Sequence, residues 1–217
     1  TKLFKSMCRM LLTIGKFSDL SPYMDFLVQM ADEGKGAPHH DGFGYVLYTK
    51  NETIALKSIE PAKKVPDLYG TALIAHARKI SSSTKSIVNT QPFTHGDLSF
   101  AHNGTIKGLE KRGTSDSFNF FKMIIKDLPS AVSTVRDMKF TSLNFIITDG
   151  RYAAAYREVK TEPGYYSLFY KIEEDRFTIS TEEMSGKWYE ILNKTLIVYR
   201  NGRINEYDAS DIFPSVI

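Results

Sequence analysis

Short apolar runs, separated by turn residues, recur along the whole chain and predict β-strands. In the first half these runs cover residues 8–14, 44–48, 53–58, 72–77 and 98–102. In the second half they cover residues 143–148, 152–157, 166–172, 176–180, 196–200 and 203–207. Because the runs follow one another at short intervals, they predict antiparallel sheets rather than a parallel, doubly wound fold.

Two segments instead space their apolar residues at helical intervals. Residues 21–31 form the first, with Ser21 placed as its N-cap, and residues 117–128 form the second, with Asp116 or Ser115 placed to cap it. Two helices and many strands predict an α+β protein in which helices pack on the faces of antiparallel sheets.

Composition excludes several classes of protein. The 28 basic and 25 acidic residues leave a net charge of +3 and are scattered, which argues against nucleic-acid binding. No uninterrupted apolar run reaches membrane-spanning length, and charges interrupt the N-terminus too often for a signal peptide. The single cysteine excludes an intramolecular disulfide and fits a reducing compartment. These features predict a cytoplasmic protein.

The only cysteine, Cys8, directly follows Met7. If translation starts at Met7 and that residue is removed, Cys8 carries a free α-amine, with a pKa of about 8 beside a thiol pKa of about 8.5. The amine could then act as a base for the thiol on the same residue. The alternative is a buried core cysteine at the start of a strand.

Charged side chains at two positions could bind a substrate. Arg78 follows a predicted strand and could clamp a carboxylate through two hydrogen bonds, with Ser81 or Ser82 adding a donor. Asp116 could bind an ammonium group. The alternatives are a surface loop that happens to contain an arginine, and a helix N-cap.

The predicted strand at residues 98–102 is followed by Asn103-Gly104. The side-chain amide of Asn103 and the backbone N–H of Gly104 could together hold an oxyanion. A plain turn explains this dipeptide equally well.

No metal or cofactor is expected. The five histidines lack helical metal-ligand spacing, there is no second cysteine, and His39-His40-Asp41 is the only dense cluster. Asp41-Gly42-Phe43-Gly44 lacks the lysine and following helix of a phosphate-binding loop.

The order of several short motifs resembles class II glutamine amidotransferase domains. The resemblance covers nearly the whole chain, from Cys8 to about residue 207, and its most specific parts are the His-Asn-Gly turn and the His-x-Arg strand end. It implies a four-layer αββα sandwich of two antiparallel sheets, of the N-terminal-nucleophile hydrolase type. The motifs are Met7-Cys8, HHDGFG at 39–44, His76-Ala77-Arg78, NTQPF at 89–93, AHNGTI at 101–106, Ser115-Asp116-Ser117, NFIITDG at 144–150 and Ser180-Thr181-Glu182.

The resemblance also implies roles for residues. Cys8 would attack the side-chain amide of glutamine, with its α-amine as general base, and a γ-glutamyl thioester would form and be hydrolysed. Asn103 and the N–H of Gly104 would form the oxyanion hole. Arg78, with Ser81 or Ser82, would hold the substrate carboxylate, and Asp116 with the Gly104 carbonyl would hold its ammonium group.

Residues 1–7 are expected to be a leader, tag remnant or propeptide, and residues 8–217 a single glutaminase-type domain. Arg9 after the nucleophile, and Lys79, Ser81 and Ser82 after Arg78, look more like the stand-alone branch of the family. Ammonia would then be used by a separate synthase subunit, if any acceptor exists. The alternatives are a γ-glutamyl hydrolase acting on a peptide or metabolite, and a non-catalytic regulatory module that keeps the fold.

Overall fold

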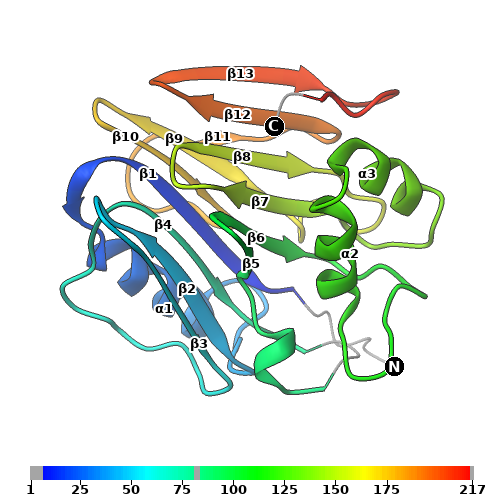
Figure 1. Ribbon diagram of the computed structural model, residues 1–217, viewed down its shortest axis with the longest axis horizontal. Coiled ribbons are helices and arrows are strands. Elements are labelled where there is room, and N and C mark those ends of the chain that lie inside the picture. The colour runs from blue at the N-terminus through cyan, green and yellow to red at the C-terminus, as the bar shows by residue number, and fades with distance from the viewer. Residues whose placement is uncertain (1–6, 81–83, 216–217) are drawn as a thin grey trace.

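Two antiparallel β-sheets stack face to face in the structure, a computed structural model that describes residues 7–80 and 84–215 (Figure 1). In spatial order, the first sheet consists of β11 (Tyr189–Glu190), β9 (Phe169–Glu173), β10 (Arg176–Ser180), β1 (Arg9–Asp19), β4 (Tyr69–Ala77), β2 (Phe43–Tyr48) and β3 (Thr53–Ser58). The second consists of β13 (Arg203–Asp208), β12 (Thr195–Arg200), β8 (Tyr152–Arg157), β7 (Asn144–Thr148), β6 (Leu98–Asn103) and β5 (Phe93–His95).

Three apolar cores separate four layers. The central core lies between the sheets, where Ile74 of β4 meets small side chains such as Ala101 of β6 and Ala155 of β8. A second core packs helix α1 (Ser21–Glu33) on the outer face of the first sheet. A third packs helices α2 (Asp116–Ile124) and α3 (Leu128–Arg136) on the second sheet. The αββα sandwich is therefore confirmed.

Helix α1 begins differently from its prediction. Leu20, not Ser21, occupies the N-cap position, and it makes no side-chain capping bond. The Ser21 hydroxyl instead accepts a hydrogen bond from the Leu68 N–H at 3.1 Å and donates to Asp19 Oδ1 at 2.7 Å. Ser21 is thus used to join the helix to the strand that precedes it, a tertiary role that its local sequence does not reveal.

The prediction of one helix over residues 117–128 is wrong at its C-terminal end. Helix α2 stops at Ile124, and α3 starts at Leu128 with Asp127 as N-cap, its carboxylate accepting from the Ser130 N–H at 2.7 Å. Asp127 followed closely by Pro129 is a helix-start signal that the apolar spacing obscured. Strands β5 and β11 and the 3₁₀ turn η1 (Ile87–Asn89) were also not predicted.

None of the described helices has the length and apolar character needed to cross a membrane.

Candidate active site

The ends of strands from both sheets meet at Cys8. Strands β1 and β4 pair with Arg9 opposite Ala77, so Cys8 lies beside Arg78. The backbone N–H of Cys8 donates a hydrogen bond of 2.9 Å to Oδ1 of Asn103, the last residue of β6. Because β1 and β6 belong to different sheets, this bond joins the two sheets directly at Cys8.

A small pocket covers the thiol. It brings together residues predicted separately from the sequence: Cys8, Arg78, Gly104 and Asp116 all line it. Ser81 and Ser82 lie outside the described residues. The other lining residues are Lys79, Ile80, Asn89, Gln91, His102, Ser115 and Ser117.

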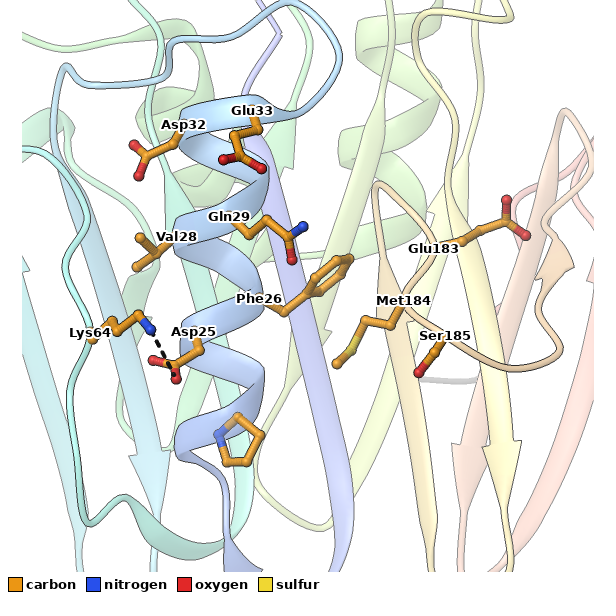
Figure 2. A pocket seen from close by; sticks show the side chains of 11 residues that line it. Asp25, Phe26, Val28, Gln29, Asp32, Glu33, Lys64, Glu183, Met184 and Ser185 are labelled. Atoms are coloured by element: carbon orange, nitrogen blue, oxygen red, sulfur yellow. Dashed lines mark ion pairs between the residues drawn. The ribbon is translucent and has the colours of Figure 1, made fainter.

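A larger hollow of about 680 Å³ runs along the outer side of α1, between Phe26 and Met184 (Figure 2). Its polar lining includes Asp25, which forms an ion pair with Lys64 at 3.8 Å. None of the predicted site residues that the structure describes lines this hollow. The larger hollow is therefore not the candidate site. Predicted site residues line the small pocket at Cys8 instead.

Asn103 has the arrangement of an oxyanion donor. Its side chain is fully buried, and while Oδ1 accepts from Cys8, Nδ2 has no hydrogen-bond partner in the described part of the chain. A buried donor without a partner is costly, so such a group generally serves a bound species. Gly104 follows directly, and a Cβ there would collide with the backbone carbonyl of Ser142. A side chain is therefore excluded next to this donor.

Asp116 is the first residue of helix α2, and Ser115 is the N-cap, accepting from the Phe118 N–H at 3.1 Å. Of the two predicted caps, Ser115 is thus the correct one. Asp116 Oδ2 accepts from the Ile106 N–H at 2.7 Å, and its carboxylate lines the pocket. One oxygen fixes the residue to the loop after β6, while the negative charge faces the pocket.

The backbone around Arg78 is fixed by Asp41 and Gly42. The Arg78 N–H donates to the Gly42 carbonyl at 2.8 Å, and Asp41 Oδ2 accepts from the Ile80 N–H at 2.8 Å. The buried Arg78 guanidinium donates from Nη2 to the Thr84 carbonyl at 3.1 Å. The segment after Asp41 therefore holds the arginine in place at the pocket wall.

The thiol of Cys8 interacts with the backbone of Lys79. Sγ lies 3.5 Å from the Lys79 N–H and 3.7 Å from the Lys79 carbonyl oxygen. Burial raises the pKa of the Cys8 thiol, and the Asp116 charge raises it further, while the Lys79 N–H and the cations Arg78 and Arg9 oppose the rise. The thiol is thus protonated at neutral pH and needs a base. An amide nitrogen, such as that of the Met7–Cys8 peptide bond, cannot serve as that base.

Two buried amide side chains, Asn89 and Gln91, support the pocket, and neither was predicted as a site residue. Asn89 Oδ1 accepts from the Ser115 N–H at 2.7 Å. Gln91 accepts from the His102 N–H at 2.6 Å and donates to the His102 carbonyl at 3.1 Å. The Gln91 side chain thereby extends the β5 ladder along β6. The segment at 89–93 was noted only as part of the resemblance.

His102 fixes the end of β6, where Asn103 leads into Gly104. Burial lowers its pKa, so the ring is neutral. Nε2 donates to the Ser142 carbonyl at 3.2 Å, and Nδ1 accepts from the Ser117 hydroxyl at 2.8 Å. Both ring nitrogens are engaged away from the thiol, so His102 positions the turn.

Arg9 supports Cys8 from the opposite side of β1. It is fully buried, pairs with Glu182 at 2.6 Å and donates from Nη1 to the Cys8 carbonyl at 3.3 Å. The Ser180-Thr181-Glu182 motif therefore contributes the partner of this arginine. No group of three or more metal-ligating side chains is found among the residues that the structure describes.

Sequence comparison gives two matches. The family model described as class II glutamine amidotransferases matches residues 7–140. The uncharacterized protein MJ1515 of Methanocaldococcus jannaschii is 24% identical, in an alignment that covers 76% of this chain and 62% of that protein. The chain thus spans less than two thirds of this curated relative.

Solved structures share the fold. The glutamine phosphoribosylpyrophosphate amidotransferase of Bacillus subtilis superposes with a TM-score of 0.68 and 16% identity, covering 94% of this chain and 50% of that one. A glutamine aminotransferase class-II domain protein of Silicibacter pomeroyi superposes with a TM-score of 0.65 and 16% identity, covering 93% and 99%. The chain is therefore similar in fold to half of the first protein and to nearly all of the second.

The charges around Cys8 predict opposite effects of two substitutions on the thiol. Arg78→Gln should raise the thiol pKa and slow alkylation at mildly alkaline pH, because the thiolate loses a nearby cation. Asp116→Asn should lower the thiol pKa and speed alkylation. Since Cys8 is the only cysteine, the pH profile of iodoacetamide labelling reports this pKa directly. Arg203→Gln and Glu206→Gln, at exposed positions of β13, are the matched controls. Shifts of the thiol pKa in the same direction in the Arg78 and Asp116 variants would contradict these charge effects.

Proposed function

The chain belongs to the class II glutamine amidotransferase family, and we propose that it hydrolyses the side-chain amide of glutamine to glutamate and ammonia through a thioester on Cys8. One observation carries the proposal: Asn103 binds the Cys8 nitrogen through Oδ1, and its buried Nδ2, next to Gly104, has no hydrogen-bond partner among the described residues. A single side chain thus connects the nucleophile to an oxyanion donor.

The first step requires a free amine on Cys8, and therefore removal of residues 1–7. The amine, with a pKa of about 8, then accepts the thiol proton that burial otherwise retains. The Asn103 Oδ1 that binds the peptide N–H remains as an acceptor for an amine hydrogen. This contact directs the amine toward the thiol of its own residue.

Bond making and breaking then follow in two stages. Sγ attacks the amide carbon of glutamine, and the carbonyl oxygen becomes an oxyanion held by Asn103 Nδ2 and the Gly104 N–H. The carbon–nitrogen bond breaks as the amine gives its proton to the leaving ammonia. Water, deprotonated by the amine, attacks the thioester and releases glutamate, and the thiol regains its proton.

Recognition of the amino acid end uses the two charges in the pocket. Arg78 binds the α-carboxylate, and Asp116, with the Gly104 carbonyl, binds the α-ammonium group. The fixed backbone around both residues supports this assignment, because a pre-set pair of opposite charges selects a zwitterion at low entropic cost. The contribution of Ser81 or Ser82 to carboxylate binding remains a prediction.

Ammonia could be released or passed to a separate synthase subunit, and the same site could hydrolyse other γ-glutamyl amides. A non-catalytic module with this fold is the remaining alternative.

We place the enzyme in the cytoplasm, because a reducing compartment preserves a nucleophilic thiol.

Protein beginning at Cys8 should release glutamate from glutamine, and Asn103→Asp should reduce kcat roughly a hundredfold or more because it replaces the oxyanion donor by an acceptor. The variant keeps an oxygen for the Cys8 nitrogen, and measuring kcat across pH separates loss of the donor from the effect of the added charge on the thiol pKa. Asn205→Asp, the same change on exposed β13, is the matched control. A coupled glutamate assay gives kcat and KM; a change in KM alone would argue against the oxyanion role.

A glutamine-like electrophile should label Cys8 rapidly only when the amine is free, because the amine is the base for the thiol. Intact mass measurements compare the full chain with protein beginning at Cys8. Equal labelling of the two forms would show that another group activates the thiol.

Asp116→Asn should raise KM for glutamine by roughly ten- to a hundredfold, since a charge-assisted hydrogen bond contributes about 1.5–3 kcal/mol. The asparagine still offers an oxygen to the Ile106 N–H, so the loop stays anchored. Asp127→Asn, at the start of α3, controls for a carboxylate change at a helix N-terminus. An unchanged KM would exclude Asp116 from ammonium binding.

A further inference from the structure

The residue before the nucleophile fills a pocket of its own. The Met7 side chain is 1% exposed and packs with Val159, Tyr165 and Tyr166, which precede β9. If Cys8 acts with a free amine, removal of Met7 vacates this space. We call this space the Met7 pocket.

A cavity of about 290 Å³ adjoins the Met7 pocket, and both Met7 and Tyr165 line it. Loss of Met7 would therefore connect the cavity to the Cys8 nitrogen. The cavity shares no lining residue with the pocket that holds Arg78 and Asp116. Cys8 itself lines the first pocket, and Met7, which is bonded to the Cys8 nitrogen, lines the second.

The wall of the Met7 pocket is fixed in place by buried side chains. Arg157 donates to the Pro163 carbonyl at 3.0 Å and to the Tyr166 carbonyl at 3.1 Å. Asn144 Nδ2 donates to the same Tyr166 carbonyl at 3.0 Å. Because these bonds do not involve Met7, the wall should persist when Met7 is gone, as a pre-formed site requires.

The proposed hydrolysis directs the group on the leaving nitrogen of the substrate into the Met7 pocket. The Cys8 amine must give its proton to the leaving nitrogen, which therefore lies within about 3 Å of the amine. In the present chain Met7 is bonded to that same Cys8 nitrogen. A group attached to the leaving nitrogen would thus extend toward the Met7 pocket, whereas ammonia from glutamine would leave it empty.

We propose that the Met7 pocket is a subsite for the leaving amine, and that the substrate class is γ-glutamyl amides whose amine carries an apolar chain about the size of a methionine side chain. The inference rests on the proposed function. The reaction has the same stoichiometry as glutamine hydrolysis: water and the amide give glutamate and a free amine. The carbon–nitrogen bond breaks, and the Cys8 amine protonates the leaving nitrogen. Val159 and the two tyrosines favour an apolar group over a charged one.

Two of the charged residues that line the cavity, Lys35 and Glu182, are already paired, and the third, Glu183, is exposed. Lys35 Nζ donates to the Gly164 carbonyl at 2.7 Å, and the Lys35 N–H donates to Glu182 Oε1 at 2.7 Å. Glu182 also pairs with Arg9. These contacts engage the charges of Lys35 and Glu182, so apolar packing against Val159, Tyr165 and Tyr166 is the main source of selectivity.

The experiment measures binding without turnover. A Cys8→Ala protein that begins at residue 8 is titrated calorimetrically with γ-glutamyl-methionine and with γ-glutamyl-glycine. Binding of the methionine compound is expected to be roughly ten- to a hundredfold tighter, because one apolar side chain becomes buried. Equal affinities, or no binding of either compound, would overturn the proposal.

A second experiment changes the size of the Met7 pocket by substitutions at Val159. Val159→Phe should reduce the preference for methionine over glycine by at least about tenfold, while Val159→Ala should shift the preference toward larger amines. Ile54→Phe, on exposed β3, is the matched control and should retain the preference. Binding of γ-glutamyl-glycine shows whether each variant keeps its glutamyl site. A preference unchanged by both Val159 variants would place the subsite elsewhere and overturn the proposal.

Turnover separates the two proposals. Protein beginning at Cys8 that hydrolyses glutamine but shows no side-chain preference would support the glutaminase and exclude the subsite. A preference in binding without release of glutamate from any amide would support the subsite and exclude the proposed hydrolysis.

Discussion

The hydrogen bond between the Cys8 nitrogen and Asn103 Oδ1 is the contact on which the site depends. It joins the start of β1 to the end of β6 and so fixes one sheet against the other where the nucleophile lies. Because one end of the Asn103 amide is committed to Cys8, its other end is held in a defined direction without a protein partner among the described residues. A single side chain thereby links the Cys8 nitrogen to a buried amide donor.

This contact requires closely packed sheets and a rigid turn. Small side chains such as Ala101 line the core between the sheets, and Gly104 leaves no room for a side chain against Ser142. Gln91 pairs with both backbone groups of His102, and the His102 ring is held at both nitrogens. The position of Asn103 is therefore determined by a network that extends well beyond the pocket.

Electrostatics impose the second constraint. The pocket places a cation and an anion near a buried thiol, and burial prevails, so the pKa of Cys8 is raised. In the proposed function both charges bind the amino acid end of the substrate, and their opposite effects on the Cys8 pKa leave the effect of burial dominant. The base must come from elsewhere, and the amine of Cys8 itself is the nearest candidate. A free amine on Cys8 requires the loss of Met7, and this loss opens the space that Met7 occupies beside the Cys8 nitrogen.

The antiparallel strands, the α+β class and the family follow from the sequence alone, because apolar runs, turn residues and the order of the motifs are local features of the chain. The sequence also nominated Cys8, Arg78, Asn103, Gly104 and Asp116, which the structure gathers at one site. The start of α1, the supports from Asn89 and Gln91, and the pocket around Met7 became apparent only in the folded chain. These features depend on side chains meeting across sheets and loops, and local periodicity carries no information about such long-range partners.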